Sequence, residues 1–207
     1  DRLVNAIILF YKKFIDEFLE FREHMECVIR YITTVDIIQC KCYVAHKYNY
    51  CRPRIVDAEK SFVSFKGIRH PLIEHIQTSE LYVTNDLDIG KGTDGLLLYG
   101  TNAVGKTSLI KSIGISVVMA QAGMYVPCSS FEFYPYSSLF TRILGNDNIF
   151  KGLSTFAVEM SELRTILTLS DKNSLILGDE LCSGTESDSA LSIFTTGLEM
   201  LHDNDSS

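Results

Sequence analysis

The feature that most constrains the fold is a glycine-rich loop at residues 100–107, which reads Gly-Thr-Asn-Ala-Val-Gly-Lys-Thr. The loop fits the pattern G-x-x-x-x-G-K-[S/T], in which backbone N–H groups at a helix N-terminus surround phosphate groups. Its two glycines let the backbone turn tightly and approach a phosphate closely. Such a phosphate loop requires a strand before it and a helix after it. We therefore predict a strand over residues 95–99, a helix over residues 107–122 and an α/β sheet.

The phosphate loop predicts a site for a nucleoside triphosphate. Lys106 should reach the β- and γ-phosphates as a point charge, and the Thr107 hydroxyl should ligate Mg²⁺. The residues expected to bind the nucleotide are Gly100, Thr101, Asn102, Ala103, Val104, Gly105, Lys106, Thr107 and Ser108.

A second acidic element supports this interpretation. The apolar run at residues 174–177 predicts a strand, and Asp179 and Glu180 follow it directly. Asp179 would hold Mg²⁺ through water, and Glu180 would polarise the attacking water. Because adjacent side chains point in different directions, one acid can serve the metal while the other serves the water. A Glu directly after the Asp is typical of ABC-type ATPases.

ABC-type ATPases usually place a serine-led helix of one subunit over the γ-phosphate bound by another. Ser154 stands just before a predicted helix over residues 155–169. Serine favours the N-cap position, and a helix N-terminus is also a good anion site. The residues alone favour helix capping without a further function over a contact with phosphate.

The chain divides near Pro53 into a helical segment, residues 1–54, and an α/β domain, residues 55–207. Apolar residues in the first segment follow the three-and-four spacing of one helix face, and no Pro or Gly occurs before Pro53. We therefore expect one or two long helices between residue 3 and about residue 50. Short β-prone runs follow at residues 55–56, 62–65 and 81–83.

Charge and cysteine content exclude several classes of protein. The helical segment holds nine Lys/Arg and seven Asp/Glu, whereas residues 55–207 hold ten and nineteen. So acidic a domain is a poor direct ligand for DNA phosphates. The six cysteines show no disulfide framework and indicate reduced thiols inside a cell, with no membrane segment and no secretion signal. A zinc site at Cys40, Cys42, His46 and Cys51 is disfavoured by their spacing.

Several further motifs accompany the phosphate loop and Asp179-Glu180. They are residues 48–53 (Tyr-Asn-Tyr-Cys-Arg-Pro), 67–74 (Gly-Ile-Arg-His-Pro-Leu-Ile-Glu), Asn85-Asp86, residues 122–127 (Ala-Gly-Met-Tyr-Val-Pro), 140–143 (Phe-Thr-Arg-Ile), 154–160 (Ser-Thr-Phe-Ala-Val-Glu-Met) and Gly184-Thr185. In combination, the chain from about residue 30 to its end resembles the ATPase region of MutS-type DNA mismatch-repair proteins. The resemblance implies an ABC-type P-loop ATPase domain, incomplete at its C-terminus, that follows a helical lever.

The resemblance also implies residue roles. Ser154 would contact the γ-phosphate of the partner subunit's nucleotide, and Asn102 would lie near the γ-phosphate and the attacking water. Tyr82 would stack on adenine; the alternative for its position is an ordinary aromatic of an edge strand. Thr101 and Ala103-Val104 replace the family's usual Pro and Met-Gly, which indicates a distant branch such as those of large viruses or organelles.

The resemblance implies a Mg²⁺-dependent, DNA-dependent ATPase with ATP as its nucleotide. The full-length protein would form a homodimer or a MutS-like heterodimer and would clamp mismatched double-stranded DNA through domains absent from this chain, so the isolated segment should be weak or inactive. Two alternatives remain: a related ATPase that acts on branched or recombining DNA, and a non-catalytic remnant that binds nucleotide. The sequence does not distinguish nucleus, cytoplasm, organelle and viral factory.

Overall fold

The computed structural model describes residues 2–76, 81–101, 104–143, 155–179, 187–204 and 206. They belong to two compact units, Asp1–Lys47 and Tyr48–Ser207. The helices are α1 (Arg2–Leu19), α2 (Arg22–Tyr48), α3 (Ile73–Ile76), α4 (Lys106–Gln121), α5 (Thr155–Leu169) and α6 (Ser187–Asp203). The strands are β1 (Arg54–Ile55), β2 (Phe62–Ile68), β3 (Asn85–Ile89), β4 (Ser130–Tyr134), β5 (Ser138–Arg142) and β6 (Ser174–Gly178).

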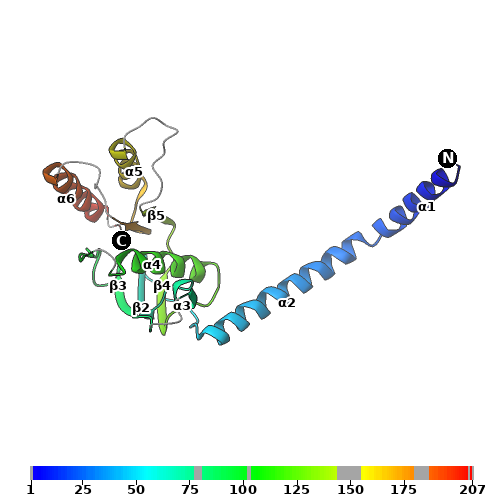
Figure 1. Cartoon of the computed structure of the whole chain (residues 1–207), viewed down its shortest axis with the longest axis horizontal. Helices are drawn as coiled ribbons and strands as arrows, with labels where there is room; N and C mark the ends of the chain where they lie inside the picture. Colours follow the sequence, from blue (N-terminus) through cyan, green and yellow to red (C-terminus); the bar gives the residue numbers. More distant parts are fainter. Residues whose placement is uncertain are drawn as a thin grey trace. The chain divides into compact units, whose positions relative to one another are not determined.

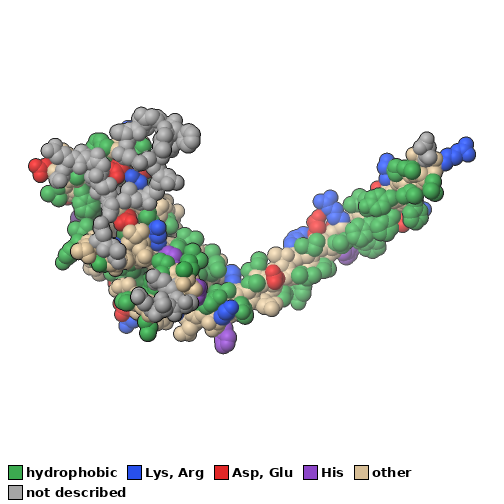
Figure 2. Space-filling view, viewed as in Figure 1, with side chains coloured by type: hydrophobic (Ala, Val, Ile, Leu, Met, Phe, Trp, Pro, Cys, Tyr) green, Lys and Arg blue, Asp and Glu red, His purple; other side chains and the backbone are tan. Residues whose placement is uncertain are grey.

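The first unit consists of α1 and most of α2, as the apolar spacing and the lack of Pro and Gly predict. The apolar stripe of α1 lies open to solvent, and Figure 2 shows hydrophobic side chains along this segment. Its exposed members include Val4, Ile7, Ile8, Tyr11, Phe14 and Phe18. Among the described helices, none combines the length and the apolar character needed to cross a membrane.

The second unit contains a four-stranded sheet in the order β1-β4-β2-β3. β2 pairs antiparallel with both β3 and β4, while β1 pairs parallel with β4. Alternate residues of β2 and β4 point into the core, so Val63, Phe65, Phe131 and Phe133 are buried together. This sheet is largely antiparallel, in contrast to the parallel sheet that strict alternation of strands and helices favours.

A separate parallel pair, β5 and β6, completes the strands of the described chain. Helix α4 lies between this pair and the four-stranded sheet and contacts both β2 and β6 (Figure 1). Its buried apolar residues Ile110, Ile113 and Val117 join the core that holds Leu175 and Leu177 of β6. The helix that follows the phosphate loop is therefore packed from two sides.

Small residues on α4 make this double packing possible. Ser112, Gly114 and Ser116 are buried on the helix together with its apolar residues. A Cβ atom placed on Gly114 would lie 2.8 Å from Cδ1 of Leu177, which is itself buried. Gly114 thus lets α4 approach β6 closely, and this approach sets the distance between the start of α4 and the end of β6.

Two of the predicted strands are wrong. Residues 95–99 form no strand: Leu98 packs against the core, but Leu96, Leu97 and Tyr99 are exposed. Residues 81–83 are also irregular, and the strand in this region is β3, a few residues later. Apolar β-prone residues form a strand only when a neighbouring strand supplies hydrogen-bond partners, and local sequence does not report on that neighbour.

We predict that Gly114→Ala lowers the free energy of unfolding, whereas Gly197→Ala in α6 does not. Both changes gain up to about 1 kcal/mol of helix propensity. Only the new methyl group at residue 114 overlaps a buried side chain, and such overpacking costs about 1–3 kcal/mol. Chemical denaturation of the two variants should place Gly114→Ala about 2 kcal/mol below Gly197→Ala. Equal stabilities would contradict the tight contact between α4 and β6.

Candidate functional site

The centre of the candidate site is a hydrogen bond between two predicted metal-binding residues that are far apart in the sequence. The Thr107 hydroxyl donates to Oδ2 of Asp179 over 2.6 Å. Thr107 lies in the first turn of α4, and Asp179 directly follows β6. The packing of α4 on β6 thus brings the phosphate loop and the acidic strand end together.

The backbone just before α4 has one feature that is typical of a phosphate site, although residues 95–99 ahead of it form no strand. Gly105 is the residue before α4 and has φ +94°, a left-handed conformation that glycine adopts without strain. No side chain caps the helix through Gly105, so the first N–H groups of α4 have no side-chain acceptor from this residue. Unpaired N–H groups and the helix dipole attract an anion to such a terminus.

Lys106 folds back on its own loop. Its ammonium group donates to the carbonyl oxygens of Gly100 and Thr101, each over 2.8 Å. These bonds hold a positive charge beside the start of α4. Phosphate oxygens are stronger acceptors than carbonyl oxygens because they are charged, so they can replace these partners.

The donors brought together by α4 and β6 suit a hard divalent cation. Thr107 supplies a hydroxyl oxygen and Asp179, only 9% exposed, supplies carboxylate oxygens, which are ligands that Mg²⁺ prefers. In the part of the chain that the structure describes, no cluster of three or more His, Cys, Asp or Glu side chains could hold a metal ion. Cys40 and Cys42, two residues of the disfavoured zinc site, are exposed free thiols.

The remaining predicted site residues divide into two sets. Val104 is exposed, Ser108 is half-buried in the first turn of α4, and Tyr82 is half-buried in the irregular segment 81–84. Tyr82 does not belong to an edge strand. Asn102, Ala103, Ser154 and Glu180 lie outside the described residues, so their predicted roles stay predictions.

Arg142, which has no role in the sequence-based predictions, lies beside the end of β6 in the structure. The backbone N–H of Asp179 donates to the Arg142 carbonyl over 2.7 Å, because β5 and β6 run parallel with Arg142 beside Gly178. The Arg142 guanidinium pairs with Glu159 and Glu162 of α5. The i, i+3 spacing of these two acids was the signal available in the sequence, but it does not identify the partner strand.

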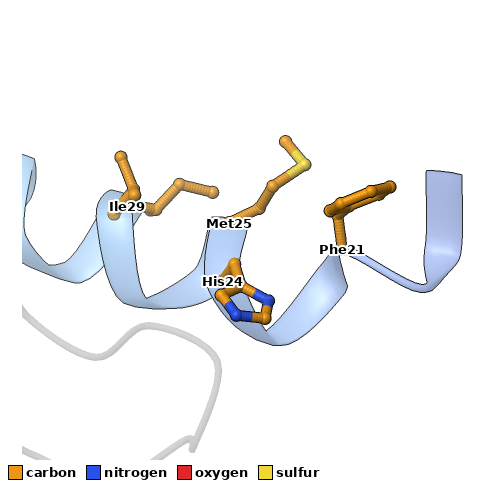
Figure 3. Close-up of a pocket in the computed structure, with 5 residues that line it drawn as sticks. Phe21, His24, Met25 and Ile29 are labelled. Atoms are coloured by element: carbon orange, nitrogen blue, oxygen red, sulfur yellow. The ribbon is translucent and has the colours of Figure 1, made fainter.

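A separate apolar hollow lies on α2 in the first unit. Its lining residues Phe21, His24, Met25, Val28 and Ile29 all come from the start of this helix or the residue before it. Figure 3 shows Phe21, Met25 and Ile29 projecting from the same side of the helix. It contains none of the predicted nucleotide ligands, so it is not part of the candidate site.

Comparison with known proteins identifies a family and several relatives of this chain. Residues 96–207 match the family described as MutS domain V. A mitochondrial DNA mismatch repair protein mutS homolog of Sarcophyton glaucum is 40% identical over 178 residues, which cover 84% of this chain and 18% of that protein.

Two further relatives extend the comparison to a virus and a bacterium. A putative DNA mismatch repair protein mutS homolog of Acanthamoeba polyphaga mimivirus is 33% identical, with 95% of this chain and 21% of that protein covered. The DNA mismatch repair protein MutS of Lactococcus lactis subsp. lactis is 33% identical, with coverage of 87% and 21%. The chain thus spans about a fifth of the length of these relatives. Organellar and viral relatives are among them, as the unusual phosphate loop led us to expect.

We predict that Gly105→Ala weakens the binding of a triphosphate by about tenfold, because an L-residue in the left-handed region costs roughly 1–2 kcal/mol. A Cβ at residue 105 has no neighbour within 4 Å, so the cost comes from the backbone and not from a clash. Gly92→Ala, also free of neighbours and without a strained φ, is the matched control. Titration calorimetry with MgATP measures both affinities; equal losses would show that the conformation of Gly105 is not required.

Proposed function

Because this chain belongs to the MutS family, we propose that residues 55–207 bind and hydrolyse ATP as part of an ABC-type ATPase domain. The 2.6 Å contact between Thr107 and Asp179 carries this proposal. It unites the end of an acidic strand with the start of a helix that follows a glycine-rich loop, and these two parts together make a site for a triphosphate and its metal ion.

The binding step uses the loop and α4. The β- and γ-phosphates lie against the first N–H groups of α4, and Lys106 exchanges the carbonyls of Gly100 and Thr101 for phosphate oxygens. Ser108 and Val104 complete the backbone around the phosphates. The Tyr82 ring stacks on the adenine, since it is partly exposed and carries no strand pairing.

Thr107 and Asp179 are the residues that would hold Mg²⁺, with Asp179 acting through water. When bound, the ion supplies charge neutralisation at the β- and γ-phosphate oxygens. Asp179 is 9% exposed. Its carboxylate accepts a hydrogen bond from the Thr107 hydroxyl, and its backbone N–H donates to the Arg142 carbonyl, so both parts of the residue are held in place.

The hydrolytic step uses residues on both sides of this pair. Glu180 accepts a hydrogen bond from the attacking water and orients it toward the γ-phosphorus, and Asn102 contacts the γ-phosphate and that water. Ser154, which directly precedes the first residue of α5 in the sequence, acts in the partner subunit's site, because the N-terminus of a helix favours an anion. The complete site is therefore formed only in a dimer.

We further propose that dimer closure is coupled to the clamping of mismatched DNA. The names of the relatives support only the general task, DNA mismatch repair. The acidic balance of residues 55–207 makes them unsuited to grip DNA themselves. The helical segment, residues 1–54, would transmit the nucleotide state to DNA-binding domains. Comparing the stimulation of ATP hydrolysis by mismatched and by branched duplexes separates mismatch repair from the recombination alternative.

We predict that Lys106→Ala abolishes ATP binding and that Glu180→Gln preserves binding but stops hydrolysis. Lys106 supplies charge to the phosphates in the ground state, whereas Glu180 acts on the water during the reaction. Nucleotide affinity and steady-state phosphate release should be measured in the protein expressed from its complete reading frame. Lys111→Ala, an exposed lysine of the same helix, is the control and should leave both quantities unchanged. Hydrolysis at the wild-type rate by Glu180→Gln would refute the assigned mechanism. If the unmodified protein binds ATP but does not hydrolyse it, the non-catalytic remnant is favoured.

A second prediction concerns the metal ion. Thr107→Val removes the hydroxyl that lies beside Asp179 and keeps the side-chain shape, so hydrolysis should fall about tenfold to a hundredfold. Thr107→Ser retains the hydroxyl and should stay within a few-fold of wild type. Titrating Mg²⁺ against the hydrolysis rate checks the cause: the Thr107→Val variant should need more Mg²⁺ for half-maximal activity, and an unchanged Mg²⁺ dependence would argue against Thr107 as a ligand.

A further inference from the structure

Arg142 joins the acidic end of β6 to helix α5. Its carbonyl accepts the backbone N–H of Asp179 over 2.7 Å. Its guanidinium lies 3.2 Å from the Glu159 carboxylate through one terminal nitrogen and 2.9 Å from the Glu162 carboxylate through Nε. One residue therefore contacts the proposed metal-holding strand end and the side of α5 at the same time.

Arg142, Glu159 and Glu162 form a cluster that is buried to different degrees. The Glu159 side chain is 5% exposed and that of Arg142 is 17% exposed, whereas the Glu162 side chain is 47% exposed. A buried carboxylate is costly unless it is paired, so Glu159 holds Arg142 in one position. The guanidinium is planar and rigid, and it contacts two acids spaced i, i+3 on one face of α5. These contacts fix the helix in rotation as well as in distance.

The position of α5 matters because its first residue, Thr155, directly follows Ser154 in the sequence. Glu159 lies only about 6 Å along the helix axis from that first residue, at 1.5 Å of rise per residue. A constraint on Glu159 and Glu162 is therefore a constraint on the start of α5. Asp179 serves the nucleotide of its own subunit, whereas Ser154 serves the nucleotide of the partner.

We propose that Arg142 is a positioning residue that holds the start of α5 in register with the Asp179 end of β6, and so couples the two composite ATP sites of a dimer. This inference rests on the proposed function, because it assigns α5 a role in the partner's site. Arg142 itself touches no nucleotide. It acts through Asp179 on one side and through α5 on the other.

If the ion pair only stabilised the fold, its loss would change stability but not kcat in a folded protein. A double variant separates this stabilising role from the proposed positioning role. Arg142→Met alone removes the arginine partner of the buried Glu159 carboxylate, which can unfold the domain. Arg142→Met combined with Glu159→Met removes both charges, and apolar replacement of a buried ion pair is commonly neutral or stabilising. The double variant thus keeps the fold while it removes the link between β5 and α5.

The experiment measures thermal unfolding, MgATP affinity and kcat in the protein expressed from its complete reading frame. For the double variant we expect unchanged unfolding, affinity within about twofold of wild type, and a kcat lower by about tenfold to a hundredfold, since misplacement by about an ångström has such effects. Glu162→Gln and Arg142→Lys leave at least one ion pair in place and should give intermediate kcat values. Arg164→Met, an exposed arginine on the same helix, is the control and should behave as wild type.

Wild-type kcat in the double variant would overturn the inference, and so would a loss of MgATP affinity that parallels the loss of kcat. If the double variant does not fold, wild-type kcat in both Glu162→Gln and Arg142→Lys would overturn it in the same way. The proposed function fails on a separate observation: a wild-type protein that neither binds nor hydrolyses ATP would refute that function, and this inference with it. Wild-type hydrolysis that is insensitive to Arg142 would refute only the coupling.

Discussion

The candidate site depends on the close packing of α4 between two layers of strands. The apolar face of this helix joins the core of the four-stranded sheet, and Gly114 allows the approach to Leu177 of β6. Without that approach the Thr107 hydroxyl and the Asp179 carboxylate could not lie 2.6 Å apart. A contact between α4 and β6 that forms part of the core thus sets the geometry of the polar site. Tight interior packing limits how far the two elements can move apart.

Charged groups lie on both sides of the candidate site that this packing forms. The predicted phosphate loop places a lysine ammonium and a helix N-terminus on one side of the site, and β6 ends in a carboxylate on the other. β5 and β6 are parallel and their carboxyl ends lie together, which is where α/β sheets commonly bind ligands. The same edge carries Arg142, whose charge is balanced by two acids of α5. Groups that would be costly to bury alone are therefore held in pairs next to the proposed reaction centre.

The success of sequence-based prediction differed between helices and strands. The bounds of α4 and α5 agree closely with the predicted helices at residues 107–122 and 155–169, and β6 agrees with the predicted strand at 174–177. The strands predicted at residues 81–83 and 95–99 are wrong, although both runs are apolar and β-prone. A helix satisfies its hydrogen bonds within its own segment, whereas a strand needs a partner that local sequence does not specify. The family was recognised because its motifs are short and local, and the match over residues 96–207 confirms it.

The sequence by itself determined the chemistry of the groups: a glycine that tolerates φ +94°, a lysine and a threonine after it, and an acid at the end of an apolar strand. It also determined the helices, because their hydrogen bonds and apolar spacing are properties of contiguous residues. Only the tertiary structure decided that Thr107 contacts Asp179, that Gly114 is the point of close approach, and that Arg142 pairs with α5. The physical reason is that these contacts join residues from 17 to 72 positions apart. Their distances follow from how helices and strands pack, which no local pattern encodes.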